Sequence, residues 1–233
     1  MQIKRIFLLI VIAFILNSCI NTIDGNGKVV KEKRTIETFT KIDISGGFEI
    51  MMNQGNEERL ELEIDENLLE LIETEVKNNT LYISSTKPIG NASSLKLYIT
   101  TVNLENIDAS GAIELKNKGT FNAENLDINV SGAADIKLDI DIENLNIDLS
   151  GASETTLVGN ADNFNIVISG AGELNAKKLK TRNTSIDISG AGNAIVNAKK
   201  TLEVSVSGAG SVKYKGDPKV KKDISGAGSI EKI

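Results

Sequence analysis

The chain has 233 residues with 40% hydrophobic side chains, enough for one domain or a small pair with a real core. It contains no histidine, so the commonest general base and the commonest transition-metal ligand are both missing. Aromatic residues make up 4%, which leaves little material for stacking on sugars or bases, and the net charge of −6 disfavours nucleic acid as a partner.

The chain begins with a segment that is expected to be processed and to lie outside the fold. Lys4 and Arg5 supply a positive start, and the apolar run at residues 6–16 is too short for a membrane span of about 20 residues. Residues 16–19, Leu-Asn-Ser-Cys, resemble a bacterial lipobox, in which the cysteine becomes the first residue and is acylated. We expect a lipoprotein signal peptide at residues 1–18 and lipidation of Cys19; a secretory signal or an anchoring helix are the alternatives.

The segment after the lipid site, residues 19–30, is polar and contains Gly25 and Gly27, which predicts a flexible tether. A single folded domain is expected over residues 31–233. The lone cysteine cannot form an internal disulfide.

Residues 31–101 carry alternating apolar and polar stretches, for example at 60–64 and 95–99, which predict half-buried strands. Residues 67–76 fit either a short helix or a turn that feeds another strand. Because this part is about three repeat lengths long, it is expected to consist of divergent coils that cap one end of a stack.

A short motif recurs through residues 102–233 at nearly constant spacing. Full Ser-Gly-Ala-Gly copies and their relatives begin at Ser45, Ser110, Ser131, Ser150, Ser169, Ser189, Ser207 and Ser225. From Ser110 onward the steps are 21, 19, 19, 20, 18 and 18 residues. A period near 20 residues indicates one supersecondary unit stacked many times.

The second motif position is glycine in every copy, which predicts a positive φ or a close backbone approach there. These corner glycines are Gly46, Gly111, Gly132, Gly151, Gly170, Gly190, Gly208 and Gly226. The third-position alanine is expected in a cramped interior bend, and the serine can bond to backbone groups at the corner.

On both sides of each corner, apolar residues alternate with other residues as they do along a strand. Each repeat is therefore predicted to consist of a strand, a corner and a second strand. We predict an all-β fold, a right-handed parallel β-helix with about 20 residues per coil. The outward residue two before each motif serine alternates between acidic and neutral: Asp108, Asn129, Asp148, Val167, Asp187, Ser205 and Asp223. Like charges directly opposite on stacked strands are destabilising, so this alternation supports one coil per motif.

A second acidic file follows directly after the corners, with Glu114, Asp135, Glu154 and Glu173 on successive coils and Glu49 before them. An outward stripe of this kind could bind Ca²⁺ or a basic partner surface. Alternatively, the acids fan out into water and pair with Lys116 and Lys137. No EF-hand pattern is present, so no metal site is assigned.

Catalysis has little support in the sequence. The serines lack the glycine two residues earlier that a hydrolase elbow needs, and no histidine could activate them. A pair of carboxylates could still act as acid and base, but the acids are spread one per coil. We therefore expect no catalytic residue and no cofactor.

The lipobox, the opening Phe39-x-x-Ile42-x-Ile44-Ser45-Gly46-Gly47 and the SGAG corners together resemble the head GIN domain family. That family is described as auto-transporter adhesins and is abundant in Bacteroidetes-type bacteria. The resemblance covers about residue 33 to the C-terminus. It implies a right-handed β-helix in the outer envelope and an adhesive role, and it carries over no functional residues.

These observations predict a non-catalytic lipoprotein of the cell envelope, anchored in the outer membrane, that acts as an adhesin or binding scaffold. The expected partners are the membrane, through the lipid, and a host or cell-surface glycan or protein, with no nucleic acid. Because the sequence stops just after a corner, self-association into a homo-oligomer is also expected. The alternatives are a structural envelope oligomer without a ligand and a polysaccharide-degrading β-helix enzyme.

Overall fold

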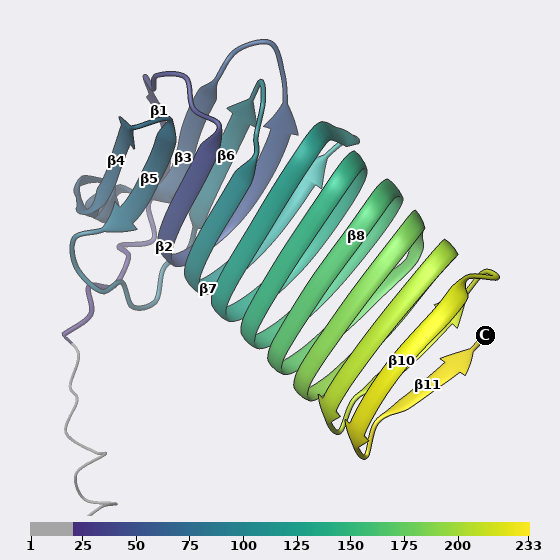
Figure 1. The fold of residues 1–233 in the computed structure, drawn as a ribbon. Helices are drawn as coiled ribbons and strands as arrows, with labels where there is room; N and C mark the ends of the chain where they lie inside the picture. Colours follow the sequence, from purple (N-terminus) through teal and green to yellow (C-terminus); the bar gives the residue numbers. More distant parts are fainter. Residues whose placement is uncertain (1–20) are drawn as a thin grey trace, which may run out of the picture.

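The computed structural model describes residues 21–233, so the signal segment and Cys19 lie outside the described residues. Within that range the chain forms eleven strands and one short 3-10 helix, which confirms the all-β expectation. Figure 1 shows a row of similar turns stacked one after another, with shorter strands grouped at the N-terminal end. No helix in this range has the length and apolar character needed to cross a bilayer.

The eleven strands belong to one sheet, and one short helix lies between the third and fourth strands. They are β1 (Val29–Arg34), β2 (Lys41–Gln54), β3 (Arg59–Asp65), η1 (Glu66–Leu71), β4 (Ile72–Lys77), β5 (Thr80–Ser85), β6 (Leu95–Thr101), β7 (Asn106–Lys118), β8 (Phe121–Gly208), β9 (Ser211–Lys215), β10 (Lys219–Gly226) and β11 (Ser229–Lys232). The main pairing order is β1-β3-β6-β2-β7-β8-β9-β11, while β10 joins β8, and β4 joins the sheet through β5, which pairs with β2.

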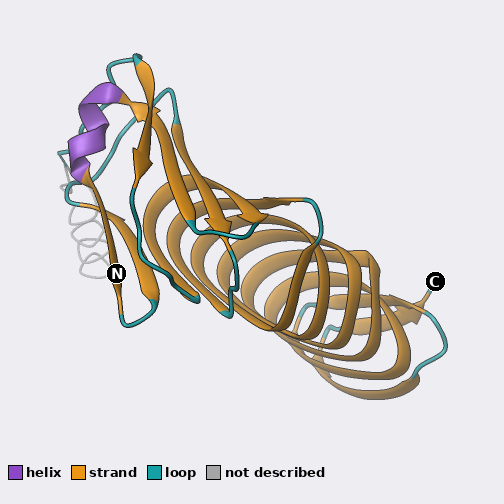
Figure 2. Cartoon of the chain, turned by 90° about the horizontal axis from the view of Figure 1, so that it is seen from above, coloured by secondary structure: helices purple, strands orange, loops and turns teal. Residues whose placement is uncertain are grey.

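The motif copies pair with one another in parallel and in register. Ser45 pairs with Ser110, Ser110 with Ser131, and Ser207 with Ser225, so each register offset equals the motif spacing in the sequence. Pairing between β7 and β8 continues through the corner itself. Strand β8 is correspondingly long, and Figure 2 shows the chain winding around the stack in successive turns.

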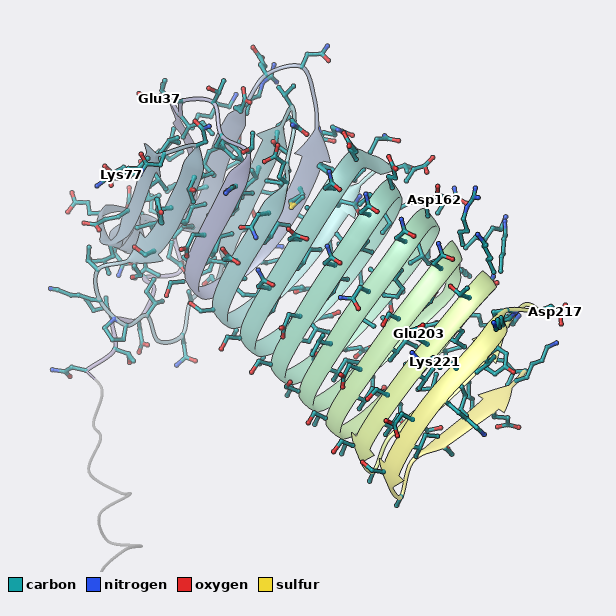
Figure 3. All side chains as sticks on the ribbon, viewed as in Figure 1. Glu37, Lys77, Asp162, Glu203, Asp217 and Lys221 are labelled. Carbon is teal, nitrogen blue, oxygen red and sulfur yellow. The ribbon has the colours of Figure 1, made fainter. Side chains whose placement is uncertain are left out.

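The interior of the stack is filled by the apolar residues that flank the corners. Ile107, Ile128 and Ile166 are each at most 1% exposed, and they belong to one hydrophobic cluster that runs from Phe39 to Val212. The residues between them point outward because side chains alternate along a strand. Polar side chains cover the outside of the turns, where Glu203 and Lys221 lie 3.6 Å apart as an ion pair (Figure 3).

The N-terminal cap differs from the expected divergent coils. Strands β1, β3 and β6 pair antiparallel, as do β4 and β5, while β2 pairs in parallel with β5 and β6. Asn78 and Asn79 both have positive φ between β4 and β5, which is typical of a two-residue hairpin turn. Antiparallel pairs need only short connections, so the cap covers the first turn with little chain. Each alternative for residues 67–76 holds in part, since η1 is followed by β4.

Residues 21–28, which we call the N-terminal strap, also differ from the expected flexible tether. Ile23 forms a parallel bridge with Ile89, and the Gly25 amide donates to the Asn91 carbonyl at 2.7 Å. The Asn67 side chain bonds the strap twice, by accepting from the Asn26 amide and by donating to the Asp24 carbonyl, both at 2.9 Å. The strap is therefore part of the folded cap.

Candidate functional site

The corner glycines form a column along one edge of the stack. All eight have positive φ, from 102° to 139°. In every turn after the first, the backbone approaches the preceding glycine so closely that a Cβ would collide with it; on Gly190 the Cβ would lie 2.5 Å from the Gly170 carbonyl oxygen. Only glycine tolerates both the dihedral and the contact.

The third motif position corrects the expectation of a cramped interior bend. The alanines at this position, such as Ala112 and Ala133, are exposed. The fourth position is the buried one in most turns, with Phe48 3%, Ile113 4% and Ala134 9% exposed. The strand alternation continues through the corner, since Ala109 and Ile113 on either side of it are buried and Ala112 is exposed, so the small alanine stands on the outer surface. A row of such small side chains leaves a hollow along the corner.

That hollow, which we call the corner groove, has a volume of about 780 Å³ and runs across five turns. Its apolar lining comes from the third and fourth motif positions, and one edge is formed by a file of carboxylates. The lining residues are Gly47, Phe48, Glu49, Ala112, Ile113, Glu114, Ala133, Ala134, Asp135, Ala152, Ser153, Glu154, Ala171 and Glu173.

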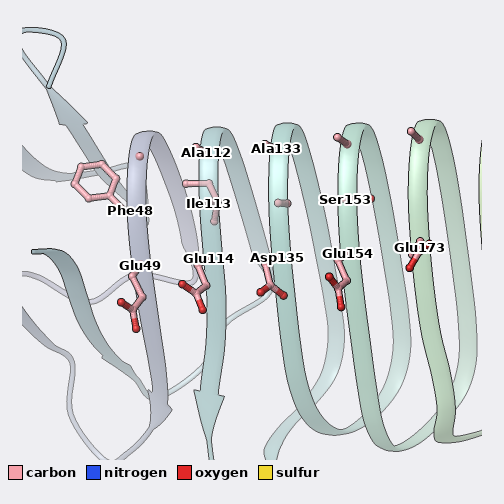
Figure 4. Close-up of a pocket in the computed structure, with 14 residues that line it drawn as sticks. Phe48, Glu49, Ala112, Ile113, Glu114, Ala133, Asp135, Ser153, Glu154 and Glu173 are labelled. Carbon is pink, nitrogen blue, oxygen red and sulfur yellow. The ribbon is translucent and has the colours of Figure 1, made fainter. Parts of the chain in front are cut away.

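The acidic stripe, Glu114, Asp135, Glu154 and Glu173, occupies equivalent places on successive turns, continuing from Glu49 (Figure 4). The register brings Glu49 beside Glu114 and Glu114 beside Asp135. All of these side chains are partly or fully exposed, so the stripe faces outward along the groove.

Lysines neutralise one half of the stripe. Glu49 pairs with Lys96 at 2.9 Å, Asp135 pairs with Lys137 at 2.7 Å, and Glu114 pairs with Lys116. The hydrogen bond from Lys137 to Asp135 raises the pKa of that lysine above its ordinary value of 10.5. The sequence-based alternative of lysine pairing therefore holds at Glu114 and Asp135.

The other half of the stripe is left without lysine. Glu154 and Glu173 form no ion pair within residues 21–233, because the position two residues later is Thr156 or Asn175 instead of lysine. Both glutamates also line a second hollow of about 400 Å³, together with Asn193, Ser211 and Lys213 of the following turns, although Lys213 forms no ion pair with either glutamate in the described residues. The two hollows thus share their most negative edge.

The acids are arranged as a row and not as a cluster. In the described part of the chain, no group of three or more His, Cys, Asp or Glu is placed to hold a metal ion. Stacked strands lie about 4.8 Å apart, so outward carboxylates on successive turns are distributed along the axis. The geometry favours contact with a partner surface over coordination of one cation.

The file of residues that lie two before each motif serine, from Asp108 to Asp223, faces outward as expected, and one of its neutral members, Asn129, also forms a hydrogen bond. Asn129 donates from Nδ2 to Asp108 Oδ1 at 2.7 Å. The alternation does not extend to the preceding turn, where Asp43 pairs directly with Asp108. Burial raises the pKa of Asp43 above its ordinary value, and the negative charge of Asp108 raises it further.

An asparagine ladder on the outside of the turns was not predicted from the sequence. Each side-chain amide donates to the asparagine of the preceding turn: Asn144 to Asn125 at 2.9 Å, Asn163 to Asn144 at 2.8 Å, and Asn183 to Asn163 at 2.8 Å. Thr201 continues the ladder by donating to Asn183 at 2.9 Å. The signal was present in the spacing of these asparagines, which recur 19, 19 and 20 residues apart.

Comparison with known proteins gives a consistent picture. The family described as "Putative auto-transporter adhesin, head GIN domain" matches residues 38–218. A crystal structure of a "putative adhesin" from Bacteroides fragilis is 27% identical with a TM-score of 0.82, covering 91% of this chain and 100% of that one.

Two further solved structures share the fold. A "putative lipid binding protein" from Parabacteroides distasonis is 24% identical with a TM-score of 0.73, and the match covers 91% of this chain and 100% of that one. A "putative adhesin" from Parabacteroides merdae is 21% identical with a TM-score of 0.69, covering 91% and 99%. No curated protein matches the chain.

Proposed function

The chain belongs to the head GIN domain family, and from that membership we propose that it is a non-catalytic lipoprotein of the cell envelope that acts as an adhesin or binding scaffold. In this proposal residues 1–18 are a signal peptide and Cys19 carries the lipid that holds the protein on the outer membrane. Its partner is a host or cell-surface protein or glycan that carries positive charge.

The display surface in this proposal is a right-handed parallel β-helix over residues 31–233, with one coil of about 20 residues per motif. Register offsets equal to the motif spacing support one coil per motif. The right hand is proposed because crossovers between parallel strands are right-handed in nearly all cases. Such a scaffold repeats the same surface chemistry at each turn.

The observation that carries the proposal is the corner groove with its acidic stripe. Its five turns span about 19 Å at ~4.8 Å per turn, which suits an extended ligand. The exposed alanines allow a ligand to approach the backbone closely, and the carboxylates attract cationic groups. Glu154 and Glu173 are proposed as the strongest contacts because no lysine of residues 21–233 pairs with them.

Attachment of coated beads to cultured epithelial cells tests this role. Beads carrying the protein are expected to attach more than albumin-coated beads, and Glu154→Gln combined with Glu173→Gln is expected to reduce attachment several-fold. The matched control is Glu114→Gln combined with Asp135→Asn, which also removes two carboxylates, both of them already paired with lysines. Attachment no better than with albumin would refute the adhesin role, and equal loss in both variants would refute the assignment of the two glutamates.

Protease treatment of intact cells tests the location. Digestion of the protein on intact cells is expected if the stack is displayed outside the outer membrane. Digestion only after lysis would contradict adhesion and would indicate a partner in the periplasm.

A further inference from the structure

The N-terminal strap is bonded to the cap from Ile23 onward. The Ile23 amide donates to the Pro88 carbonyl at 2.9 Å, and the Gly90 amide donates back to the Ile23 carbonyl at 3.0 Å. The Asp24 carboxylate accepts from the Asn91 amide at 2.8 Å. Farther along, the Glu66 backbone amide donates to the Lys28 carbonyl at 2.8 Å, and β1 then pairs with β3. The chain is thus held from Ile23 onward.

Close packing at two glycines reinforces these bonds. A Cβ on Gly25 would collide with the carboxylate of Asp65, which is fully buried. A Cβ on Gly90 would collide with Asp24 and would lie 2.8 Å from Thr22 Oγ1. The strap fits against the cap only because both positions lack a side chain.

The docked strap leaves very little free chain before it. Ile23, the first residue of the strap that is bonded to the cap, lies four residues after Cys19. Four residue steps reach at most about 14 Å even when fully extended. A lipid on Cys19 therefore cannot hold the domain far from the bilayer in which it is inserted.

We infer that the cap end of the molecule lies directly on the lipid surface, in contact through the strap and the adjoining loop at residues 86–94, and that the C-terminal turns are the distal end. The inference rests on the proposed lipidation of Cys19. It deepens the proposed function by stating which end of the stack is held at the membrane and which end is presented.

The local charge of this face fits a lipid headgroup layer. The strap and the loop together contain Asp24, Lys28 and Lys87, and Lys28 pairs with Glu66 at 2.8 Å, so these four side chains sum to zero, whereas the whole chain carries −6. Lys87 and Pro88 are exposed on the loop that the strap pairs with. An anionic or zwitterionic surface can therefore approach this end without the repulsion that the acidic turns would cause.

The far end is well separated from the proposed contact. Seven turns separate the motif at Ser45 from the motif at Ser225, a rise of about 34 Å at ~4.8 Å per turn. Figure 1 shows the cap at one end of the row of turns and the C-terminus at the other.

Fluorescence quenching in vesicles tests the orientation. The lipidated full-length mature chain is inserted into phosphatidylcholine–phosphatidylglycerol vesicles that contain headgroup-nitroxide lipids. A fluorophore is attached at Lys87→Cys or at Glu231→Cys, since acylated Cys19 does not react. Quenching at position 87 is expected to exceed quenching at position 231 at least threefold. Equal quenching at both positions, or stronger quenching at 231, would overturn the inference.

A lengthened chain tests the role of the short connection. Twelve Gly and Ser residues inserted between Cys19 and Ile20 are expected to reduce quenching at position 87 to the level at 231, whereas an unchanged value would overturn the inference. Mass spectrometry of the N-terminal peptide reports the lipid separately. An unmodified Cys19 would overturn the proposed anchor and this inference together, whereas a modified Cys19 with equal quenching at both positions would overturn this inference alone.

Discussion

Replacing Gly151 by alanine tests the glycine column most directly. Gly151 has a φ of +123°, and an added Cβ would collide with the carbonyl of Gly132 in the preceding turn. The strained dihedral costs about 1–3 kcal/mol. Forcing two adjacent backbones apart adds about 1–3 kcal/mol, as in other overpacked interiors. The lower entropy of the unfolded alanine chain offsets less than about 1 kcal/mol. We expect a net loss of about 3 kcal/mol in the free energy of unfolding.

Gly119→Ala provides the matched control. Gly119 also has positive φ, +75°, but a Cβ there would meet nothing within 4 Å. Its dihedral strain of about 1–2 kcal/mol is largely offset by the same gain in the unfolded state. The difference between the two variants therefore isolates the close approach of successive turns.

Urea unfolding followed by far-ultraviolet circular dichroism measures both variants. With a denaturant slope of about 3 kcal/mol per M, Gly151→Ala is expected to lower the midpoint by about 1 M, and Gly119→Ala by about 0.3 M or less. Equal shifts would refute the reasoning, because they would mean that the contact between the glycine backbones adds nothing to the dihedral effect.

Three further changes have expected outcomes in the same unfolding assay. Asn163→Ala removes two ladder hydrogen bonds and should cost about 1–2 kcal/mol, whereas Asn175→Ala, which removes no side-chain hydrogen bond within residues 21–233, should be neutral within about 0.5 kcal/mol. Thr155 is fully buried with no partner for Oγ1 in the described chain, so Thr155→Val should stabilise by about 1 kcal/mol, and a loss would show that the hydroxyl is satisfied. Because the pKa of Asp43 is raised in the folded protein, its protonated form favours folding. This contribution to the free energy of unfolding is complete below pH 3.8, the ordinary pKa of the group, and is lost as the pH rises through the folded-state pKa. Asp43→Asn should therefore stabilise by about 0.5 kcal/mol at pH 7 and have no effect at pH 3; an equal effect at both pH values would exclude the electrostatic cause.

The repeat made the stacked part of the fold predictable. A fixed motif spacing determines the register between turns, so the pairing of Ser110 with Ser131 could be read from the sequence alone. The invariant glycine likewise pointed to a special backbone conformation. Such features depend on local chemistry that is repeated many times, which makes the pattern visible in a single chain.

The cap was not predictable in the same way. Its strands occur once each, and their antiparallel pairing depends on contacts that no period reveals. Similarly, the composition of the strap predicts a flexible tether. The bonds that hold it come from Asn67 and Asn91, which lie far along the chain, so its own sequence does not reveal them. The outward position of the third-position alanines follows from strand alternation through the corner, so the expected interior position was wrong because the corner was treated as a break in that alternation.

Part of the candidate site could be anticipated. The acidic stripe follows from the position directly after each corner, and its outward direction follows from strand alternation. The groove itself could not be derived, because it depends on the exposed alanines and on the buried fourth position. Pairing with Lys116 and Lys137 was an alternative that the sequence left open, and the structure shows it at Glu114 and Asp135.

The in-register stacking of turns also affects how the protein can change in length. Because each turn contacts chiefly its two neighbours, a gene segment that encodes one turn can be duplicated or deleted without redesign of the others. Each such event would lengthen or shorten the molecule by about 4.8 Å. If the stack is the binding scaffold proposed above, its display surface would change in length by whole turns while the surface chemistry of the remaining turns stayed the same.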